Sequence, residues 1–307
     1  MARRIRCVTV AVAVLGGLLV EAGAAGAAPI ACGTTITAST TLTADMTCPG
    51  DAIVIGAPGV VLDLGGHTLS GGGFLAEGAG VRVQASGATV RNGRVTTFRY
   101  GVHLGPGSDG ALVEGLTLVI DIDGSFVASS SNRFRGNSFV DNSGAMLIAG
   151  AANSVEGNSF VDNDGGILVV GPSNAIVANS MKGAGGDDSG IVSYGAGTRI
   201  ASNSVSGYGG YAGIGMSSSG EVTGNQVFSN VNGIYVSGPA TIAGNVVFSN
   251  ADDGIEVAPG SGAVLRGKIA IQNADLGIDA AAGVVDAGGN RAFANGNPQQ
   301  CVGVVCS

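Results

Sequence analysis

Asparagine recurs along this sequence at almost constant intervals, and this periodicity limits the possible folds more than any other feature. The six members of the series are separated by 21, 21, 24, 22 and 20 residues. They are Asn137, Asn158, Asn179, Asn203, Asn225 and Asn245. Self-similarity with a period in the low twenties predicts a solenoid, in which each repeat forms one coil that stacks on the next.

Each coil is expected to contain three short β-strands. Apolar residues recur three positions before and two positions after the asparagine, and a Gly-Ile-x-Val pattern marks a third strand, as at Gly233-Ile234. Helical periodicity is nearly absent, and 56 of the 307 residues are glycine. The asparagines are expected to be structural, because Asn tolerates a left-handed backbone at turns and stacked amides hydrogen-bond to the coils above and below.

The chain divides into four predicted segments. Arg3, Arg4 and Arg6 precede an apolar run that is followed by small residues, which is typical of a secretory signal peptide, with an uncleaved anchor as the alternative. No other apolar stretch is long enough to cross a membrane. The segments are 1–27, the signal peptide; 28–79, an N-terminal cap with the first coil; 80–296, the regular repeats; and 297–307, a C-terminal tail.

The charge and cysteine content of the predicted mature chain bear on its partners and predict disulfides. Removal of the signal peptide leaves 11 Lys and Arg against 21 Asp and Glu, a formal net charge of about −10. An acidic protein of this kind does not resemble a nucleic-acid binder. Four cysteines remain, and an even number in an exported protein implies disulfides. In a rod they lie two at each end, so the predicted pairs are Cys32–Cys48 and Cys301–Cys306.

Several motifs together point to a family. They are the repeated Gly-Ile-x-Val strand, Gly-Asn pairs such as Gly157-Asn158, and a second asparagine five residues later, as at Asn163. Over residues 53 to about 295 the pattern resembles the right-handed parallel β-helix proteins of the pectate-lyase-like superfamily. The resemblance implies an all-β, right-handed, single-stranded parallel β-helix of about 10–11 coils. A leucine-rich repeat has a similar period, but leucine is sparse here.

In such proteins the functional site lies on the outer face of one sheet. The x residue of Gly-Ile-x-Val is expected to point outward. The predicted outward series is Arg82, His103, Phe126, Met146, Leu168, Val192, Gly215, Tyr235, Glu256 and Asp279. Its middle is apolar, which predicts either a surface covered by a loop or neighbouring chain, or a binding surface.

Aspartates precede the same strand and are the main candidates for chemistry. The catalytic candidates are Asp187, Asp188, Asp252 and Asp253, with Lys182 and Arg199 as the nearest basic residues in the sequence. Carboxylates on adjacent coils, about 5 Å apart, either raise each other's pKa or hold a cation. Asp164 and Asp188 are the metal candidates; the resemblance implies calcium, while the fold is expected to need no cofactor. Aspartate is also a common turn residue.

A second candidate cluster lies nearer the N-terminus. Arg82 and His103, with Arg99, Tyr100 and the carboxylates Asp121 and Asp123, are candidates for binding a uronate and moving a proton. Sugar platforms usually contain aromatic residues. The tyrosines that cluster in sequence are Tyr194, Tyr208, Tyr211 and Tyr235, of which Tyr194, Tyr211 and Tyr235 are the substrate-binding candidates.

Two functions therefore remain open. One is a secreted, non-catalytic surface or matrix protein that interacts with carbohydrate. The other is a lyase, hydrolase or epimerase acting on an acidic polysaccharide, as the resemblance implies. The Asn-Thr-Asp, Gly-His-Gly and Arg-Ile-Lys signatures of the hydrolases and the Asp-Pro-His of the epimerases are missing, which favours the first. Polysaccharide is the expected partner, and the sequence leaves the oligomeric state open.

Overall fold

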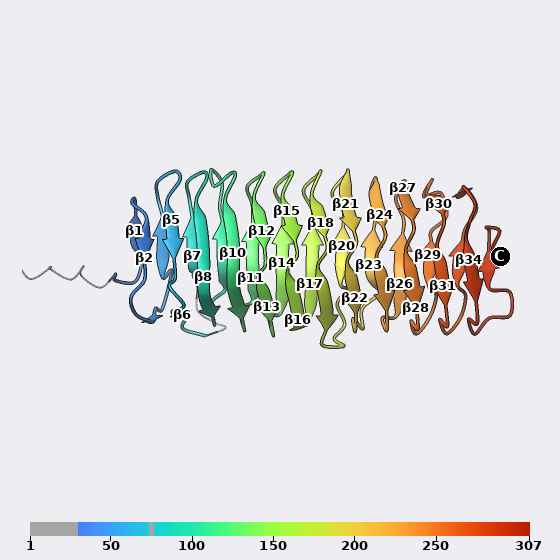
Figure 1. The fold of residues 1–307 in the computed structure, drawn as a ribbon, viewed down its shortest axis with the longest axis horizontal. Helices are drawn as coiled ribbons and strands as arrows, with labels where there is room; N and C mark the ends of the chain where they lie inside the picture. Colours follow the sequence, from blue (N-terminus) through green and yellow to red (C-terminus); the bar gives the residue numbers. More distant parts are fainter. Residues whose placement is uncertain (1–29, 74–76) are drawn as a thin grey trace, which may run out of the picture.

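The chain is a rod of stacked coils, a right-handed parallel β-helix (Figure 1). The computed structural model describes residues 30–73 and 77–307, so the predicted signal peptide lies outside the described residues. The described secondary structure consists of strands and turns. None of the described residues forms a helix long and apolar enough to cross a lipid bilayer.

One sheet runs the full length of the rod, and we call it sheet A. It has 13 strands that pair in parallel with those of the coils before and after. They are β1 (Thr34–Ile36), β4 (Ile53–Ile55), β7 (Ala79–Val83), β9 (Tyr100–Leu104), β11 (Asp123–Val127), β14 (Gly144–Ile148), β17 (Gly165–Val169), β20 (Ile191–Ser193), β23 (Ala212–Met216), β26 (Asn232–Val236), β29 (Ile255–Val257), β32 (Ile278–Ala280) and β35 (Cys301–Val302).

Two further stacks of parallel strands close each coil. Stack B comprises β2 (Thr40–Thr41), β5 (Val61–Asp63), β8 (Thr89–Thr96), β10 (Leu112–Val119), β12 (Arg133–Arg135), β15 (Ser154–Glu156), β18 (Ala175–Val177), β21 (Thr198–Ala201), β24 (Gly220–Thr223), β27 (Ala240–Ala243), β30 (Val264–Arg266) and β33 (Val285–Asp286). Stack C comprises β3 (Met46–Thr47), β6 (Thr68–Ser70), β13 (Ser138–Val140), β16 (Ser159–Asn163), β19 (Ser180–Gly183), β22 (Ser204–Ser206), β25 (Gln226–Phe228), β28 (Val246–Phe248), β31 (Ile269–Ile271) and β34 (Arg291–Phe293). The long strands β8 and β10 pass through both stacks.

The predicted architecture of three strands per coil is confirmed. The rod has about 12 coils, slightly more than the predicted number, because the N-terminal strands already stack in register: β1 pairs with β4, and β4 pairs with β7. Aliphatic and aromatic side chains from every coil fill the interior, and some identical residues stack directly. The rings of Phe139 and Phe160, for example, are parallel with centroids 4.7 Å apart. Each coil thus buries its apolar surface only against its neighbours.

The strand register corrects one predicted outward residue. Phe126 of β11 pairs with Leu147 of β14, so Leu147 points outward and Met146 is only 2% exposed. The prediction was offset by one residue because Ala145 occupies the position that glycine fills in the neighbouring coils, as Gly124 and Gly166 do. The preceding Gly144 imitated the motif in the sequence.

The predicted asparagine ladder is present. Asn158 Oδ1 accepts hydrogen bonds from the backbone N and Nδ2 of Asn137 at 2.9 and 3.0 Å. The N and Nδ2 of Asn158 donate in turn to Asn179 Oδ1 at 2.9 and 3.1 Å. We predicted that the asparagine itself adopts the left-handed backbone conformation, and this was wrong. The residue before it does so, as at Gly136 and Ala178. The asparagine instead lies inside the turn and satisfies buried backbone groups.

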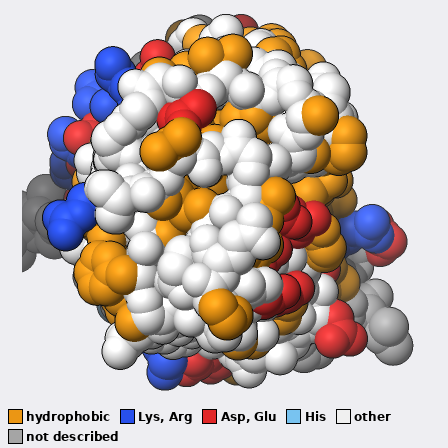
Figure 2. Space-filling view, turned by 90° about the vertical axis from the view of Figure 1, so that its right-hand side faces the viewer, with side chains coloured by type: hydrophobic (Ala, Val, Ile, Leu, Met, Phe, Trp, Pro, Cys, Tyr) orange, Lys and Arg blue, Asp and Glu red, His pale blue; other side chains and the backbone are white. Residues whose placement is uncertain are grey.

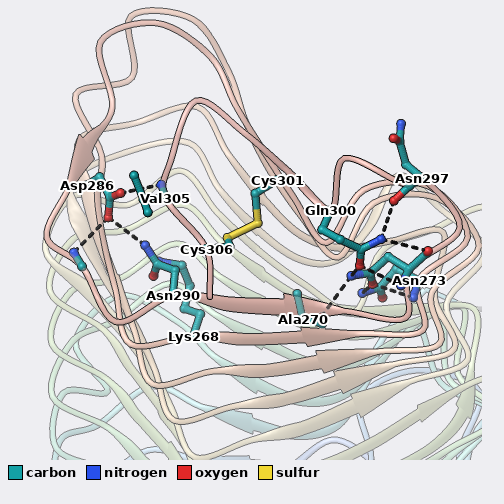
Figure 3. The surroundings of a disulfide bond; sticks show 12 residues. Lys268, Ala270, Asn273, Asp286, Asn290, Asn297, Gln300, Cys301, Val305 and Cys306 are labelled. Atoms are coloured by element: carbon teal, nitrogen blue, oxygen red, sulfur yellow. Dashed lines mark hydrogen bonds between the residues drawn. A yellow bond between two sulfur atoms is a disulfide. The ribbon is translucent and has the colours of Figure 1, made fainter.

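Two further asparagine ladders strengthen the other turns. One includes Asn142 and Asn163, where Asn142 N and Nδ2 donate to Asn163 Oδ1. It is interrupted in the next two coils, where Gly183 and Tyr208 lie, and resumes with Asn230, Asn250, Asn273 and Asn295. The other comprises Asn132, Asn153 and Asn174, which the sequence analysis missed. In the C-terminal tail, Gln300 Oε1 accepts from Asn295 N and Nδ2 and so ends the longer of these two ladders (Figure 3).

Both predicted disulfides form. Cys32 bonds to Cys48 at the N-terminal end, and Cys301 bonds to Cys306 at the C-terminal end (Figure 3). The C-terminal tail is also held by the Asp286 carboxylate, which accepts a hydrogen bond from Val305 N at 2.7 Å. These contacts fasten the terminal coils, which have a neighbour on one side only.

Candidate functional site

The outer face of sheet A is exposed in the middle of the rod. Leu168 and Val170 are 38% and 51% exposed, so no loop of the described chain covers them. The described chain has seven exposed large hydrophobic residues, and four of them lie on this face: Leu168, Val170, Tyr194 and Tyr211. Exposed apolar residues concentrated on one face indicate a surface for binding.

Leu168, Tyr194 and Tyr211 line a groove of about 460 Å³, which we call the sheet A groove. Its apolar wall is made by Leu147, Leu168 and Val192, which are successive outward residues of β14, β17 and β20. The groove therefore has the mixture of apolar surface and a few polar groups that is typical of ligand sites.

Two glycines and the carboxylates beside them shape one edge of the groove. Gly144 and Gly165 are in register on adjacent coils. A Cβ on Gly144 would lie 2.8 Å from Asp123 Oδ1, and a Cβ on Gly165 would lie 3.2 Å from Asp188 Oδ2. The two carboxylates thus lie beside the two glycines, Asp123 from the coil before Gly144 and Asp188 from the coil after Gly165. Burial raises the pKa of Asp123, an effect that Arg99 partly offsets.

A tyrosine held by a glutamate bounds the groove on its C-terminal side. Tyr211 Oη donates to the Glu256 carboxylate at 2.8 and 3.0 Å, and Asn232 Nδ2 donates to the same carboxylate at 3.1 Å. The Tyr235 ring packs edge-on against Tyr211, with centroids 4.7 Å apart. Desolvation and the Glu256 contact raise the pKa of Tyr211. The Tyr211 ring is therefore held in place although its side chain is exposed.

The structure separates the predicted aspartate pairs. Asp187 and Asp188 line the groove, whereas Asp252 and Asp253 lie three coils further along the same edge. At about 4.8 Å per coil the separation is about 14 Å. This distance exceeds the range of roughly 5–9.5 Å over which two carboxylates cooperate in glycoside hydrolysis. The two pairs therefore do not form one acid–base site.

The predicted basic partners of these aspartates lie elsewhere. Lys182 is on β19 of stack C, where its Nζ is 3.7 Å from Asp162 Oδ1. Arg199 is on β21 of stack B. Neither strand belongs to sheet A, so closeness in sequence was misleading: the intervening turns carry the chain to another face.

An acidic cluster lies beyond the groove, on coils nearer the C-terminal end of the rod. Asp252, Asp253 and Asp275 offer ligand atoms within 4.8 Å of one another, the one such set among the residues that the structure describes. Burial, with Asp252 and other carboxylates nearby, raises the pKa of Asp253 to about 6, despite a hydrogen bond from Leu276 N. Figure 2 shows acidic side chains gathered on one side of this end of the rod. The predicted metal candidate Asp164 is not part of this cluster.

Arg82 and His103 belong to a separate cluster near the N-terminal end. Arg82 forms a two-pronged ion pair with Asp51, at 2.6 Å from Nε and 2.8 Å from Nη2. Its Nη1 contacts His103 Nδ1, and because a guanidinium only donates, the proton of the neutral imidazole lies on Nε2. Burial and the Arg82 charge lower the pKa of His103. The His103 ring also packs against both Tyr100 and Phe126, which in turn stack on each other.

This cluster does not offer the free cations expected for uronate binding. Arg82 is neutralised by Asp51, and Arg99 pairs with Glu77 at 3.0 Å. Asp121 is fully buried and is absent from this surface. Tyr208, grouped with the other tyrosines in the sequence, is also buried in the core. Both fill turn positions that asparagine occupies in other coils, a similarity visible only once the coils are aligned.

Several groove residues were not candidates in the sequence analysis. Leu147 was hidden by the one-residue offset at β14. Gly144 and Gly165 carry no functional group, but glycine at the first position of two successive strands was an available signal of a hollow surface. Glu256 was predicted to point outward without a role, because its partner Tyr211 lies 45 residues away.

Comparison with known proteins places the chain in a family. Residues 46–208, more than half of the chain, match the family described as NosD, periplasmic copper-binding protein. No curated protein matches. A structural neighbour is the catalytic unit of the GH87 alpha-1,3-glucanase from Streptomyces thermodiastaticus strain HF3-3, with a TM-score of 0.51 and 14% identity. The alignment covers 86% of this chain and 64% of the glucanase chain, and at this identity it shows a shared fold. The chain belongs to the NosD family of β-helix proteins.

Proposed function

We propose that this NosD-family protein acts outside the cytoplasm and binds a polysaccharide in the sheet A groove. The observation that carries the proposal is the open groove itself, with Tyr194 and Tyr211 exposed by 59% and 55% beside carboxylates. Aromatic rings pack against the apolar faces of sugars, and carboxylates accept hydrogen bonds from sugar hydroxyls. A linear groove along stacked coils suits an extended polymer. The two disulfides fit an oxidising compartment.

A polysaccharide-cleaving enzyme is the second candidate. Asp187 and Asp188 are adjacent in the chain and both line the groove, which is the observation that favours it. Against it, none of the described residues that line the groove is a Lys, Arg or His that could act as the proton-abstracting base of a lyase. The binding function requires only the surface, whereas catalysis requires one carboxylate to be protonated when the other is ionised.

Copper, which the family description names, fits this chain poorly. Copper sites use His, Met and Cys ligands. His67 contacts Asp45 and His103 contacts Arg82, while the cysteines of the described residues are in disulfides. The acidic cluster Asp252, Asp253 and Asp275 offers oxygen ligands alone, which suit calcium. We therefore infer that a cation held by this chain is a hard one such as calcium.

The test is sedimentation of the purified protein with insoluble polysaccharides of different charge, with and without calcium. Binding is expected for the unmodified protein and is expected to fall at least tenfold in a Tyr194→Ala/Tyr211→Ala variant, because each stacked ring contributes on the order of 1 kcal/mol or more. The supernatants are assayed for reducing ends and unsaturated ends. Products that disappear in Asp188→Asn would support the enzyme, and the lack of binding to every polymer would overturn the proposal.

A further inference from the structure

The charges around the sheet A groove are strongly one-sided. Asp123, Asp187 and Asp188 line it, and no Lys, Arg or His of the described part of the chain does. Within residues 30–73 and 77–307, none of the salt bridges involves any of these three carboxylates. The groove is thus lined by carboxylates that no salt bridge within the described chain neutralises.

The rest of the molecule makes this asymmetry sharper. Of the Lys and Arg in the described ranges, only Arg82 lies on a strand of sheet A, and Arg99 just precedes β9. Both are already paired, with Asp51 and Glu77. All other described Lys and Arg residues lie on or between strands of stacks B and C. Viewed from the C-terminal end, most of the Lys and Arg side chains in sight lie on the side opposite the gathered acidic groups (Figure 2).

This distribution disfavours the acidic polysaccharide implied by the sequence resemblance. A polyuronate would bring a row of carboxylates against Asp123 and Asp188, and like charges at close range repel each other by an amount that grows as water is excluded. A sugar amine has the opposite effect, because an ammonium group forms strong charge-assisted hydrogen bonds with carboxylates. The exposed faces of Tyr194 and Tyr211 also attract cations.

We propose that the ligand of the groove is a polymer of sugars that carry free amino groups. This inference rests on the proposed function and specifies its ligand. The carboxylates of Asp123 and Asp188 lean over Gly144 and Gly165 from coils about 14 Å apart, so one polymer chain reaches both through different sugar units. The apolar wall between them contacts the sugar rings.

The experiment is calorimetric titration of the full mature chain with four soluble oligosaccharides. They are a chitosan hexamer, its fully N-acetylated counterpart, a neutral glucan hexamer and an oligogalacturonate. The chitosan hexamer is expected to bind about tenfold or more tightly than the acetylated one at pH 6, and to weaken with added salt. An Asp187→Asn/Asp188→Asn variant is expected to lose about tenfold of the affinity for the chitosan hexamer.

A matched control separates the site from the general attraction of an acidic protein for a cationic polymer. Asp141→Asn/Asp162→Asn removes the same charge outside sheet A, from the turn after β13 and from β16 of stack C, and is expected to change the affinity less than twofold. A Gly165→Ala variant adds a methyl group beside Asp188 without changing charge and is expected to weaken binding.

Three other outcomes would reject the binding site, the ligand class or the proposed function, respectively. Equal losses in the two double variants would overturn the groove as the binding site of the amine. Equal binding of the acetylated or glucan hexamer, or tighter binding of the oligogalacturonate, would overturn the inference and leave polysaccharide binding standing. If none of the four oligosaccharides binds and the insoluble polymers do not sediment the protein, the proposed function itself is wrong.

Discussion

Asp121 accepts a hydrogen bond from the Phe98 backbone N at 2.8 Å. Asp121 occupies the turn position that Asn142 and Asn163 fill in the next two coils. Its own backbone N donates to Asn142 Oδ1 at 2.9 Å, as a ladder asparagine would. The second carboxyl oxygen is buried and has no partner among the described residues. Burial raises the pKa of Asp121 to about 8, so the carboxyl is mostly protonated at neutral pH.

The Asp121→Asn variant is expected to be more stable and less sensitive to pH. Between pH 4 and pH 8 the folded protein holds a proton that the unfolded chain has lost, so the free energy of unfolding falls as pH rises, by at most about 1.4 kcal/mol per pH unit. Asparagine removes this slope and is expected to add roughly 2–4 kcal/mol near pH 7.5. Urea unfolding from pH 5 to 8.5 measures both effects. Asp141→Asn, an exposed aspartate in the next coil, is the control and should leave the slope unchanged.

Lys268 is a buried base, in contrast to the buried acid Asp121, and lies in the ladder that runs from Asn137 to Asn245. It follows Asn245 in that series, and its buried Nζ donates to Asn290 Oδ1 at 3.2 Å. Burial lowers the pKa of Lys268 to about 7. Between pH 7 and pH 10 the unfolded chain holds a proton that the folded one lacks, so stability is expected to rise with pH.

Replacing Lys268 by asparagine should remove this dependence. It also supplies an acceptor for the Asn245 backbone N, so the variant is expected to gain roughly 2–4 kcal/mol at pH 7. Thermal unfolding across pH 7–10 is the measurement. Lys182→Asn, at an exposed lysine on stack C, is the comparison. A Lys268→Asn variant that keeps the rising profile would show that this lysine is not its source.

An interior ladder asparagine is expected to be costly to remove. Asn158→Ala deletes the Oδ1 that accepts from Asn137 and the Nδ2 that donates to the Phe134 carbonyl at 3.0 Å. Several buried polar groups lose partners, so we expect a loss of about 3–5 kcal/mol. Chemical denaturation measures it, with Ser159→Ala on the adjacent strand as the control. A loss below 1 kcal/mol would contradict the structural role of the ladder.

The disulfides are expected to stabilise the ends of the rod locally. A Cys301→Ser/Cys306→Ser variant should speed hydrogen exchange in β32 and leave β16 unchanged, because each coil contacts only its neighbours. The Cys32→Ser/Cys48→Ser variant should instead affect β4. Each variant is the control for the other, and faster exchange along the whole rod in either would contradict local fastening.

The fold was predictable because its signals are local and repeat. The asparagine spacing predicted the coils, and the number of cysteines at each end predicted the disulfides. The site was less predictable, because it depends on which residues align across coils of unequal length. A one-residue offset at Ala145 hid Leu147, and sequence proximity associated Lys182 with aspartates on another face. The Tyr211–Glu256 contact spans 45 residues and has no sequence motif.

Tyrosine fluorescence offers the most direct measurement of ligand binding at the sheet A groove. The chain has five tyrosines and no tryptophan. Tyr100, Tyr194, Tyr211 and Tyr235 lie on the outer face of sheet A, and Tyr208 is buried as an internal reference. Titration with polysaccharide is predicted to change the emission saturably, and Tyr194→Ala/Tyr211→Ala is predicted to remove most of the change. Emission that no polysaccharide alters, or a double variant that responds like the unmodified protein, would contradict binding at this groove.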